Sequence, residues 1–484
     1  MGENSWYTKQ PYKVRIFPIV NTLGFEKSIP IGEPYDLIVC GGGPSGIPAA
    51  LAARRAGLRV LLLEQTGQLG GVGTSAGVSH LLGGRTRDNR HWCVAGIFKE
   101  IVEDLAARGG AINPVDIKGE KFSPHGWTGV VSNITYGVPF DPIQMTAILD
   151  EKMLEAGVDL LFFTSMVDVV IEAGRITHII VFNKGGLRAI PTKAVVDATG
   201  DGDVAARSGC AFVKGREEDN LMTPATLMFH VNNVDQDVLA SEIYKSNSNR
   251  FRELIQSLKD QDAWPFPYDI FISVQLHEKG TLMINTTRIC DVDGTDGVSL
   301  SKGMMQGRSE VTELFAIMKK HFPGFENARI RMVAPVLGIR ETRRIVGAFV
   351  YKVADVADEL AFPDTIGFSG YGWDLPDPKR PSYQPMHSRK DAPKLKRLAM
   401  PIPYRVLVPR PIENVICPGR AISVERDVLG PLREMGPCYA MGHAAGLASV
   451  QVVKDAIAYK EVDTDRLRDA LCEAGAVVDW EEEI

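Results

Sequence analysis

A glycine-rich turn between an apolar strand and an Ala-rich helix is the stretch of this sequence best suited to hold a phosphate. Its glycines are spaced as Gly41-x-Gly43-x-x-Gly46, and an apolar run precedes them. Gly41 would permit the tight turn, Gly43 would let a pyrophosphate approach the backbone, and Gly46 would let the helix pack closely on the strand. The start of the helix would then offer free N–H groups and a partial positive charge to the phosphates.

An acidic residue follows at the distance expected for a dinucleotide site. Glu64 closes the next apolar strand, roughly 20 residues after the glycines, where a carboxylate accepts hydrogen bonds from ribose hydroxyls. Strand, turn, helix, strand and acid therefore follow one another as in a βαβ nucleotide-binding unit. A second glycine-rich loop, residues 65–77, comes directly after Glu64. This position favours contact with the ligand over the alternative of a loose surface loop.

Several side chains elsewhere could do acid–base or anion-binding chemistry. Arg340, Arg343 and Arg344 form a basic cluster that could hold a substrate carboxylate or carbonyl, or that could form ion pairs with Glu341 and other carboxylates. Three further candidates could be general acids or bases, or ordinary core residues: His80, Tyr404 and His443. Four aromatic residues could line a pocket or pack between domains: Trp127, Tyr136, Tyr371 and Trp373.

The composition is that of an ordinary globular enzyme. The 484 residues predict roughly two to four domains, and the net charge of −6 gives no reason to propose nucleic acid or an anionic membrane as a partner. The seven cysteines are scattered without a C-x-x-C motif, which argues against a disulfide framework, an iron–sulfur site or a structural zinc. We expect no metal. With no signal peptide and no membrane-spanning segment apparent, we expect a cytoplasmic protein without membrane insertion.

Periodicity and capping residues predict the elements that must position these groups. Helices are expected at residues 94–108, 141–156, near 236–260, 301–321 and 436–454. Strands are expected at residues 159–163, 167–171, 176–182, from 194, 270–274, 281–285 and within 401–417. The strand from residue 194 stops abruptly at Thr-Gly-Asp-Gly, and ligands bind at such strand ends in open α/β sheets.

Taken together, seven motifs resemble those of the FAD-dependent oxidoreductases, a broad flavoprotein family related to the succinate dehydrogenase and fumarate reductase flavoprotein subunits. They lie at residues 41–46, 69–71, 197–203, 338–347, 402–405, 419–423 and 442–446. The resemblance covers most of residues 33–455. It implies a doubly wound, Rossmann-like α/β FAD-binding domain (34–210 and 395–460) with an inserted α+β cap or substrate domain (211–394). The remaining segments are an N-terminal arm (1–33) and a C-terminal helix with an acidic tail (461–484).

The resemblance also implies a set of FAD contacts. They are Gly41, Gly43, Pro44, Ser45 and Gly46 at the pyrophosphate, Glu64 and Gln65 at the adenosine ribose, Gly70, Gly71, Val72, Gly73 and Thr74 beside the pyrophosphate and flavin, Val167 at the adenine, and Thr199, Gly200, Asp203, Gly419 and Arg420 along the FAD. The last helix would direct its N-terminus at the flavin and stabilise the anionic reduced ring. Because no motif for covalent attachment is evident near residues 70–85, we expect noncovalent FAD.

The expected activity is hydride transfer between a small organic substrate and the flavin, in the dehydrogenase, oxidase or ene-reductase direction. The sequence shows no second nucleotide-binding motif, so a separate NAD(P)H domain is not expected. Two alternatives stay open at this point: a flavin monooxygenase, and a flavoprotein subunit that needs an electron-transfer partner. The expected partners are a small-molecule substrate, a possible external electron acceptor or donor, and a possible second copy of the chain.

Overall fold

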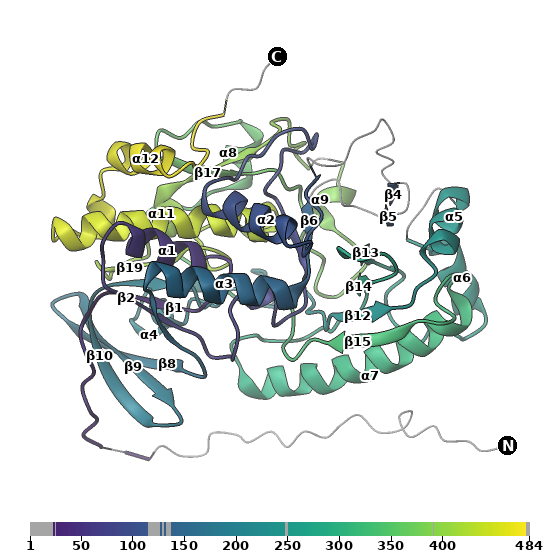
Figure 1. Ribbon diagram of the computed structural model, residues 1–484, viewed down its shortest axis with the longest axis horizontal. Coiled ribbons are helices and arrows are strands. Elements are labelled where there is room, and N and C mark those ends of the chain that lie inside the picture. Colours follow the sequence, from purple (N-terminus) through teal and green to yellow (C-terminus); the bar gives the residue numbers. More distant parts are fainter. Residues whose placement is uncertain are drawn as a thin grey trace.

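The computed structural model describes most of the chain, but the predicted N-terminal arm and the end of the acidic tail fall largely outside it. The described residues are 23–24, 26–114, 126–127, 130–131, 137–246, 250–390 and 392–480. Figure 1 shows a large sheet with its helices at one end of the molecule and a smaller sheet, flanked by helix α7, at the other.

A seven-stranded sheet is the larger of the two main sheets. Its order is β7–β2–β1–β10–β9–β8, with β19 also paired to β10. The strands are β1 (Tyr35–Cys40), β2 (Val60–Leu63), β7 (Asp159–Leu161), β8 (Ser165–Glu172), β9 (Arg175–Asn183), β10 (Gly186–Asp197) and β19 (Val415–Ile416). Strands β7, β2, β1, the end of β10 and β19 run parallel, whereas β8, β9 and the start of β10 form an antiparallel meander. A parallel core with helical cover is the predicted α/β class.

Alternate side chains of β1 pack into two different hydrophobic cores. Leu37 and Val39 face the helical layer, while Ile38 packs with apolar residues of the meander on the other face. The helical layer contains α1 (Gly46–Arg55), α2 (Ile97–Ala107), α3 (Pro142–Ala156) and α11 (Met435–Lys454). This two-sided burial explains why the last four residues of β1 and all of β2 are apolar.

Two glycines let α11 lie directly on α1. A Cβ atom at Gly442 would be 2.0 Å from the Ser45 carbonyl oxygen, and one at Gly446 would be 2.4 Å from the Ala49 carbonyl oxygen. Only glycine allows such a close approach of two backbones. The crossing brings the N-terminus of α11 beside the N-terminus of α1.

A second, four-stranded antiparallel sheet has the order β13–β14–β12–β15. Its strands are β12 (Phe229–Asn232), β13 (Ser273–Gln275), β14 (Leu282–Ile284) and β15 (Arg329–Val333). With α5 (Gln236–Ser246), α6 (Arg252–Asp260) and α7 (Gly297–His321) it encloses a separate aromatic core that includes Phe271 and Phe322. Their ring centroids are 4.6 Å apart.

Short elements complete the described structure. The short strands are β3 (His80–Leu82), β4 (Gly126–Trp127), β5 (Val130–Val131), β6 (Gly137–Pro139), β11 (Phe212–Lys214), β16 (Arg343–Ile345), β17 (Thr365–Ser369) and β18 (Met400–Pro403). The remaining α-helices are α4 (Asp203–Arg207), α8 (Val353–Ala357), α9 (Pro385–Ser388), α10 (Arg426–Leu432) and α12 (Thr464–Glu473). Among the described residues, no helix is both long and apolar enough to cross a bilayer, and no three His, Cys, Asp or Glu side chains are grouped to hold a metal ion.

Candidate active site

The turn between β1 and α1 is built as its glycines require. Gly41 has φ of +108°, and a Cβ atom at Gly46 would lie 1.8 Å from the Gly41 carbonyl oxygen. Neither position therefore accepts another residue without moving the backbone. Gly43 differs, because its missing Cβ would have only the Gly71 Cα atom within 4 Å, at 3.8 Å. The space beside Gly43 is open to the cavity that it lines, so a ligand can approach the backbone there.

Glu64 is held rigidly behind this turn. One carboxylate oxygen accepts a hydrogen bond from Gly42 N at 2.9 Å, and the other accepts from Thr66 N at 2.7 Å and Thr66 Oγ1 at 2.8 Å. The side chain is buried yet lines the cavity. Three donors in fixed positions orient the carboxylate, as a ribose contact requires.

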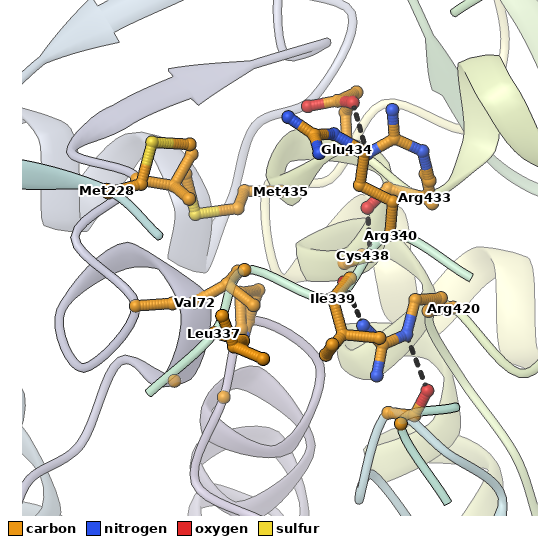
Figure 2. A pocket seen from close by; sticks show the side chains of 18 of the residues that line it. Val72, Met228, Leu337, Ile339, Arg340, Arg420, Arg433, Glu434, Met435 and Cys438 are labelled. Atoms are coloured by element: carbon orange, nitrogen blue, oxygen red, sulfur yellow. Dashed lines mark hydrogen bonds and ion pairs between the residues drawn. The ribbon is translucent and has the colours of Figure 1, made fainter. Parts of the chain in front are cut away.

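The Thr-Gly-Asp-Gly turn after β10 is organised by a buried aspartate. Asp197 accepts hydrogen bonds from Thr199 Oγ1 at 2.7 Å and Ala205 N at 2.9 Å, and burial raises its pKa to about 6. Arg420 then joins this turn to the loop before β16, because it donates to the carbonyl oxygens of Gly200, at 2.7 Å, and Ile339. Figure 2 shows Arg420 beside Ile339 at the edge of the cavity.

Helix α11 begins at the cavity. Glu434 precedes the helix, and Met435 and Cys438 in its first turn line the cavity. The N–H groups of a first helical turn have no partner within the helix, so this end carries partial positive charge. Glu434 is buried, which raises its pKa, and its carboxylate lies 3.1 Å from the Arg433 guanidinium. Figure 2 places Glu434, Arg433 and Arg340 together on one side of the cavity.

The second sheet and the loops beside it supply the remaining wall. Met228, Met283 and Leu337 contribute apolar surface, and Arg288 and Arg340 contribute charge. The whole cavity has a volume of about 800 Å³ and is continuous from Glu64 to the second sheet. This size is at the upper end of the range for cofactor and ligand pockets.

The cavity brings together most of the predicted cofactor contacts. Those that line it are Gly41, Gly43, Pro44, Ser45, Glu64, Gln65, Gly71, Val72, Thr199, Gly200, Asp203 and Arg420. The others lie behind or beside the lining: Gly46, Gly70, Gly73, Thr74, Val167 and Gly419. At the meander, the lining residues are Thr164, Ser165 and Met166 rather than Val167.

Of the predicted catalytic residues, Arg340 and His80 line the cavity and three do not. The Arg343 guanidinium is paired with Asp203 at 2.7 Å. The Tyr404 hydroxyl donates to the Tyr459 carbonyl oxygen at 2.8 Å within the core. His443 lies on the face of α11 that packs near Gly96, and burial lowers its pKa to about 4. Arg343 and Tyr404 have structural partners, and His443 does not line the cavity, so we do not assign these three side chains a role in the reaction.

His80 is placed differently. It lies at the start of β3, is 2% exposed, and its Nε2 atom has no hydrogen bond of regular geometry among the described residues, although the Gly137 backbone lies close to it. Burial lowers its pKa to about 4, so the imidazole is neutral at pH 7. A buried polar atom without a partner costs free energy unless a ligand or water satisfies it.

Of the four aromatic residues predicted to line a pocket, Tyr371 and Trp373 line the cavity. Tyr136 and the Trp127 side chain lie outside the described structure.

A family model for FAD dependent oxidoreductases matches residues 36–471. The chain belongs to this family. It is an enzyme of the oxidoreductase class, and its cofactor is FAD. The site fits that cofactor on its own geometry, because the open glycine backbone at Gly43, the oriented Glu64 carboxylate and the start of α11 line one cavity.

Individual relatives match the chain over shorter segments or at low identity. A dihydrolipoyl dehydrogenase of Trypanosoma brucei brucei is 43% identical over 53 residues, which are 11% of this chain and 11% of that protein. A digeranylgeranylglycerophospholipid reductase 1 of Methanococcoides burtonii is 28% identical over 173 residues, 35% of this chain and 38% of that protein. The chain thus spans well under half the length of both. A solved geranylgeranyl bacteriochlorophyll reductase-like protein from Thermoplasma acidophilum aligns with 91% of this chain and 84% of its own, at 11% identity and a TM-score of 0.42.

Sequence reasoning missed the residues that the second sheet and the C-terminal half bring to the cavity. Asn285 and Arg288 follow β14, and Asp374, Arg433 and Glu434 come from two distant segments. No local motif marks them. The one available signal was the charged pair Arg433–Glu434 immediately before an otherwise apolar helix.

Proposed function

We propose that this FAD-dependent oxidoreductase transfers hydride between a small organic substrate and noncovalently bound FAD, at the junction of the two sheets. The supporting observation is that one cavity is lined both by the glycine turns of the nucleotide-binding half and by side chains of the second sheet. Ligand sites of enzymes lie preferentially at such junctions. The proposal leaves the direction of hydride transfer open.

Bound FAD supplies the group that accepts or donates the hydride. The chain's own residues would do the rest. The backbone at Gly43 and the start of α1 would hold the pyrophosphate, and Glu64 would bind the ribose. Met228 and Met283 would keep water from the reacting end, and Glu434 would hold or release the substrate proton. Burial moves the pKa of Glu434 upward, toward the pH at which proton transfer is efficient.

The two hydrophobic cores indicate which part of the chain acts as the cap. Buried apolar residues of the second core run from Ala225 to Leu337, whereas Tyr351, Phe368 and Met386 belong to the first core. We propose an inserted cap that is shorter than the segment 211–394 expected from the sequence. The relation to succinate dehydrogenase and fumarate reductase flavoprotein subunits, the cytoplasmic location, an external electron acceptor or donor and a homo-oligomer stay predictions.

Anaerobic reduction of the bound flavin tests the proposal. The holoprotein would be mixed with small alcohols, hydroxy acids and amines, and chemically reduced holoprotein with activated alkenes, while the flavin absorption is recorded. We expect at least one class to reduce or reoxidise the flavin without a partner protein. A flavin that responds only to NAD(P)H, with substrate-stimulated oxygen uptake, would replace the proposal with a monooxygenase. A flavin that responds only after a partner protein is added would replace it with an electron-transfer subunit.

A further inference from the structure

Two arginines on the cap side of the cavity have no carboxylate partner. Arg288 follows β14 and is 4% exposed, and Arg340 lies in the loop before β16 and is partly buried. Both line the cavity. Among the described residues, neither guanidinium forms an ion pair with an Asp or Glu side chain. Buried cations normally have such a partner, because the loss of hydration is otherwise uncompensated.

The partners that these arginines do have are neutral oxygens. Arg340 donates to the Pro224 carbonyl oxygen at 2.6 Å and to Asn285 Oδ1 at 2.9 Å. Arg288 donates from one terminal nitrogen to the carbonyl oxygens of Asn285 and Thr287, each at 2.9 Å. Its Nε has no hydrogen-bond partner among the described residues. These contacts fix both guanidinium groups in place through neutral oxygens. The carboxylates whose charge acts on them, Asp374, Glu310 and Glu434, form no ion pair with either arginine.

The nearest carboxylates are already engaged. Glu434 pairs with Arg433 at 3.1 Å, and Asp374 accepts from Gln384 Nε2 at 2.6 Å and also lies 3.4 Å from Arg433. On the far side of Arg288, the Glu310 carboxylate accepts hydrogen bonds from Tyr268 Oη at 3.1 Å and Gln306 Nε2 at 2.9 Å. Burial, followed by the nearby charges of Arg288 and Arg433, lowers the pKa of Arg340 well below its usual range, although the charges of Asp374 and Glu434 act in the opposite direction. Arg288 and Arg340 therefore repel each other, and an anion bound beside them would offset this repulsion.

We propose that Arg288 and Arg340, with Asn285 between them, form the subsite that binds a carboxylate group of the substrate. The inference rests on the proposed function, since it assigns the substrate class of the same cavity. Guanidinium groups held in place suit a planar carboxylate, which takes two parallel hydrogen bonds. A monoanion fits better than a phosphate dianion, because Asp374 and Glu434 stand on the same side. Met228 and Met283 give the cavity an apolar surface, against which the hydrocarbon part of the substrate would pack.

The test compares carboxylates with their neutral amides on the holoprotein. Benzoate and acetate, and then benzamide and acetamide, would be titrated by isothermal calorimetry at constant chloride, while the flavin absorption is recorded. We expect saturable binding of a carboxylate and at least tenfold weaker binding of its amide, or about 1.4 kcal/mol. Equal binding of the two would overturn the proposal, as would binding of neither. Binding of inorganic phosphate in their place would assign the subsite to phosphates.

Two variants test whether Arg340 binds the carboxylate or only supports the fold. Arg340→Gln is expected to weaken carboxylate binding at least tenfold and leave amide binding unchanged. Arg308→Gln removes a positive charge from an exposed position on α7 and is expected to change neither. If Arg340→Gln fails to fold, the comparison of carboxylate and amide binding to the unmodified protein still tests the proposal. A protein without bound flavin would contradict the proposed function, whereas a flavin-loaded protein indifferent to carboxylates would contradict the subsite alone.

Discussion

Replacing Gly43 with alanine is expected to weaken FAD binding at least 100-fold and to leave the fold intact. The added Cβ atom would have only the Gly71 Cα atom within 4 Å, at 3.8 Å, which is an ordinary van der Waals contact. The protein therefore accommodates the methyl group, but the methyl group occupies space that lines the cavity. A pyrophosphate that needs close approach to this backbone is displaced, and 100-fold corresponds to about 2.7 kcal/mol.

Two matched glycine variants control this prediction. Gly46→Ala places its Cβ atom 1.8 Å from the Gly41 carbonyl oxygen, so it should disrupt the turn and lower the thermal stability even without FAD. Gly297→Ala, at the start of α7, meets nothing within 4 Å and should change neither property. Equilibrium dialysis gives the FAD affinity, and circular dichroism of the apoprotein gives its melting temperature. Unchanged affinity in Gly43→Ala would show that the pyrophosphate binds elsewhere.

Replacing Glu341 with glutamine is expected to destabilise the protein by roughly 3–5 kcal/mol, the usual cost of breaking a buried ion pair from one side. The Glu341 side chain is fully buried and lies 2.8 Å from both Arg344 and Arg426. It also accepts a hydrogen bond from Thr223 N at 2.9 Å. An amide in its place would leave two largely buried guanidinium groups without a counter-charge.

An exposed glutamate provides the comparison. Glu103 pairs with Lys99 at 3.5 Å on the surface of α2, where such pairs contribute little to stability. We expect thermal unfolding to show a large loss of stability for Glu341→Gln and little or none for Glu103→Gln. Similar melting temperatures for the two variants would mean that the buried network contributes little beyond its individual hydrogen bonds.

The sequence predicts the elements whose signals are local. The βαβ unit follows from its glycine spacing. Helix α3 begins after Asp141, which accepts a hydrogen bond from Ile143 N at 2.7 Å, and it ends at Ala156, just before Gly157 with φ of +75°. The expected helix from residue 301 instead begins at Gly297, because Asp296 caps it by accepting from Ser299 N at 2.7 Å. The helix near 236–260 is divided into α5 and α6.

Long-range partners decide what the sequence leaves open. The three clustered arginines separate: Arg340 reaches the cavity, Arg343 pairs with Asp203, and Arg344 pairs with Glu341. Nothing within residues 338–347 distinguishes them, because the deciding carboxylates and carbonyls lie elsewhere in the chain. Strand β10 begins at Gly186 rather than near residue 194, since its first half pairs with β9 and only its second half enters the parallel sheet.

The absorption spectrum of the purified protein, before and after acid precipitation, tests the central claim most directly. We predict visible flavin bands that leave the precipitate and appear in the supernatant, as expected for noncovalent FAD held by the Gly41–Gly46 turn and Glu64. Colour retained in the precipitate would mean covalent flavin and would contradict the noncovalent site. A colourless protein that also fails to bind added FAD would contradict the whole account of the cavity.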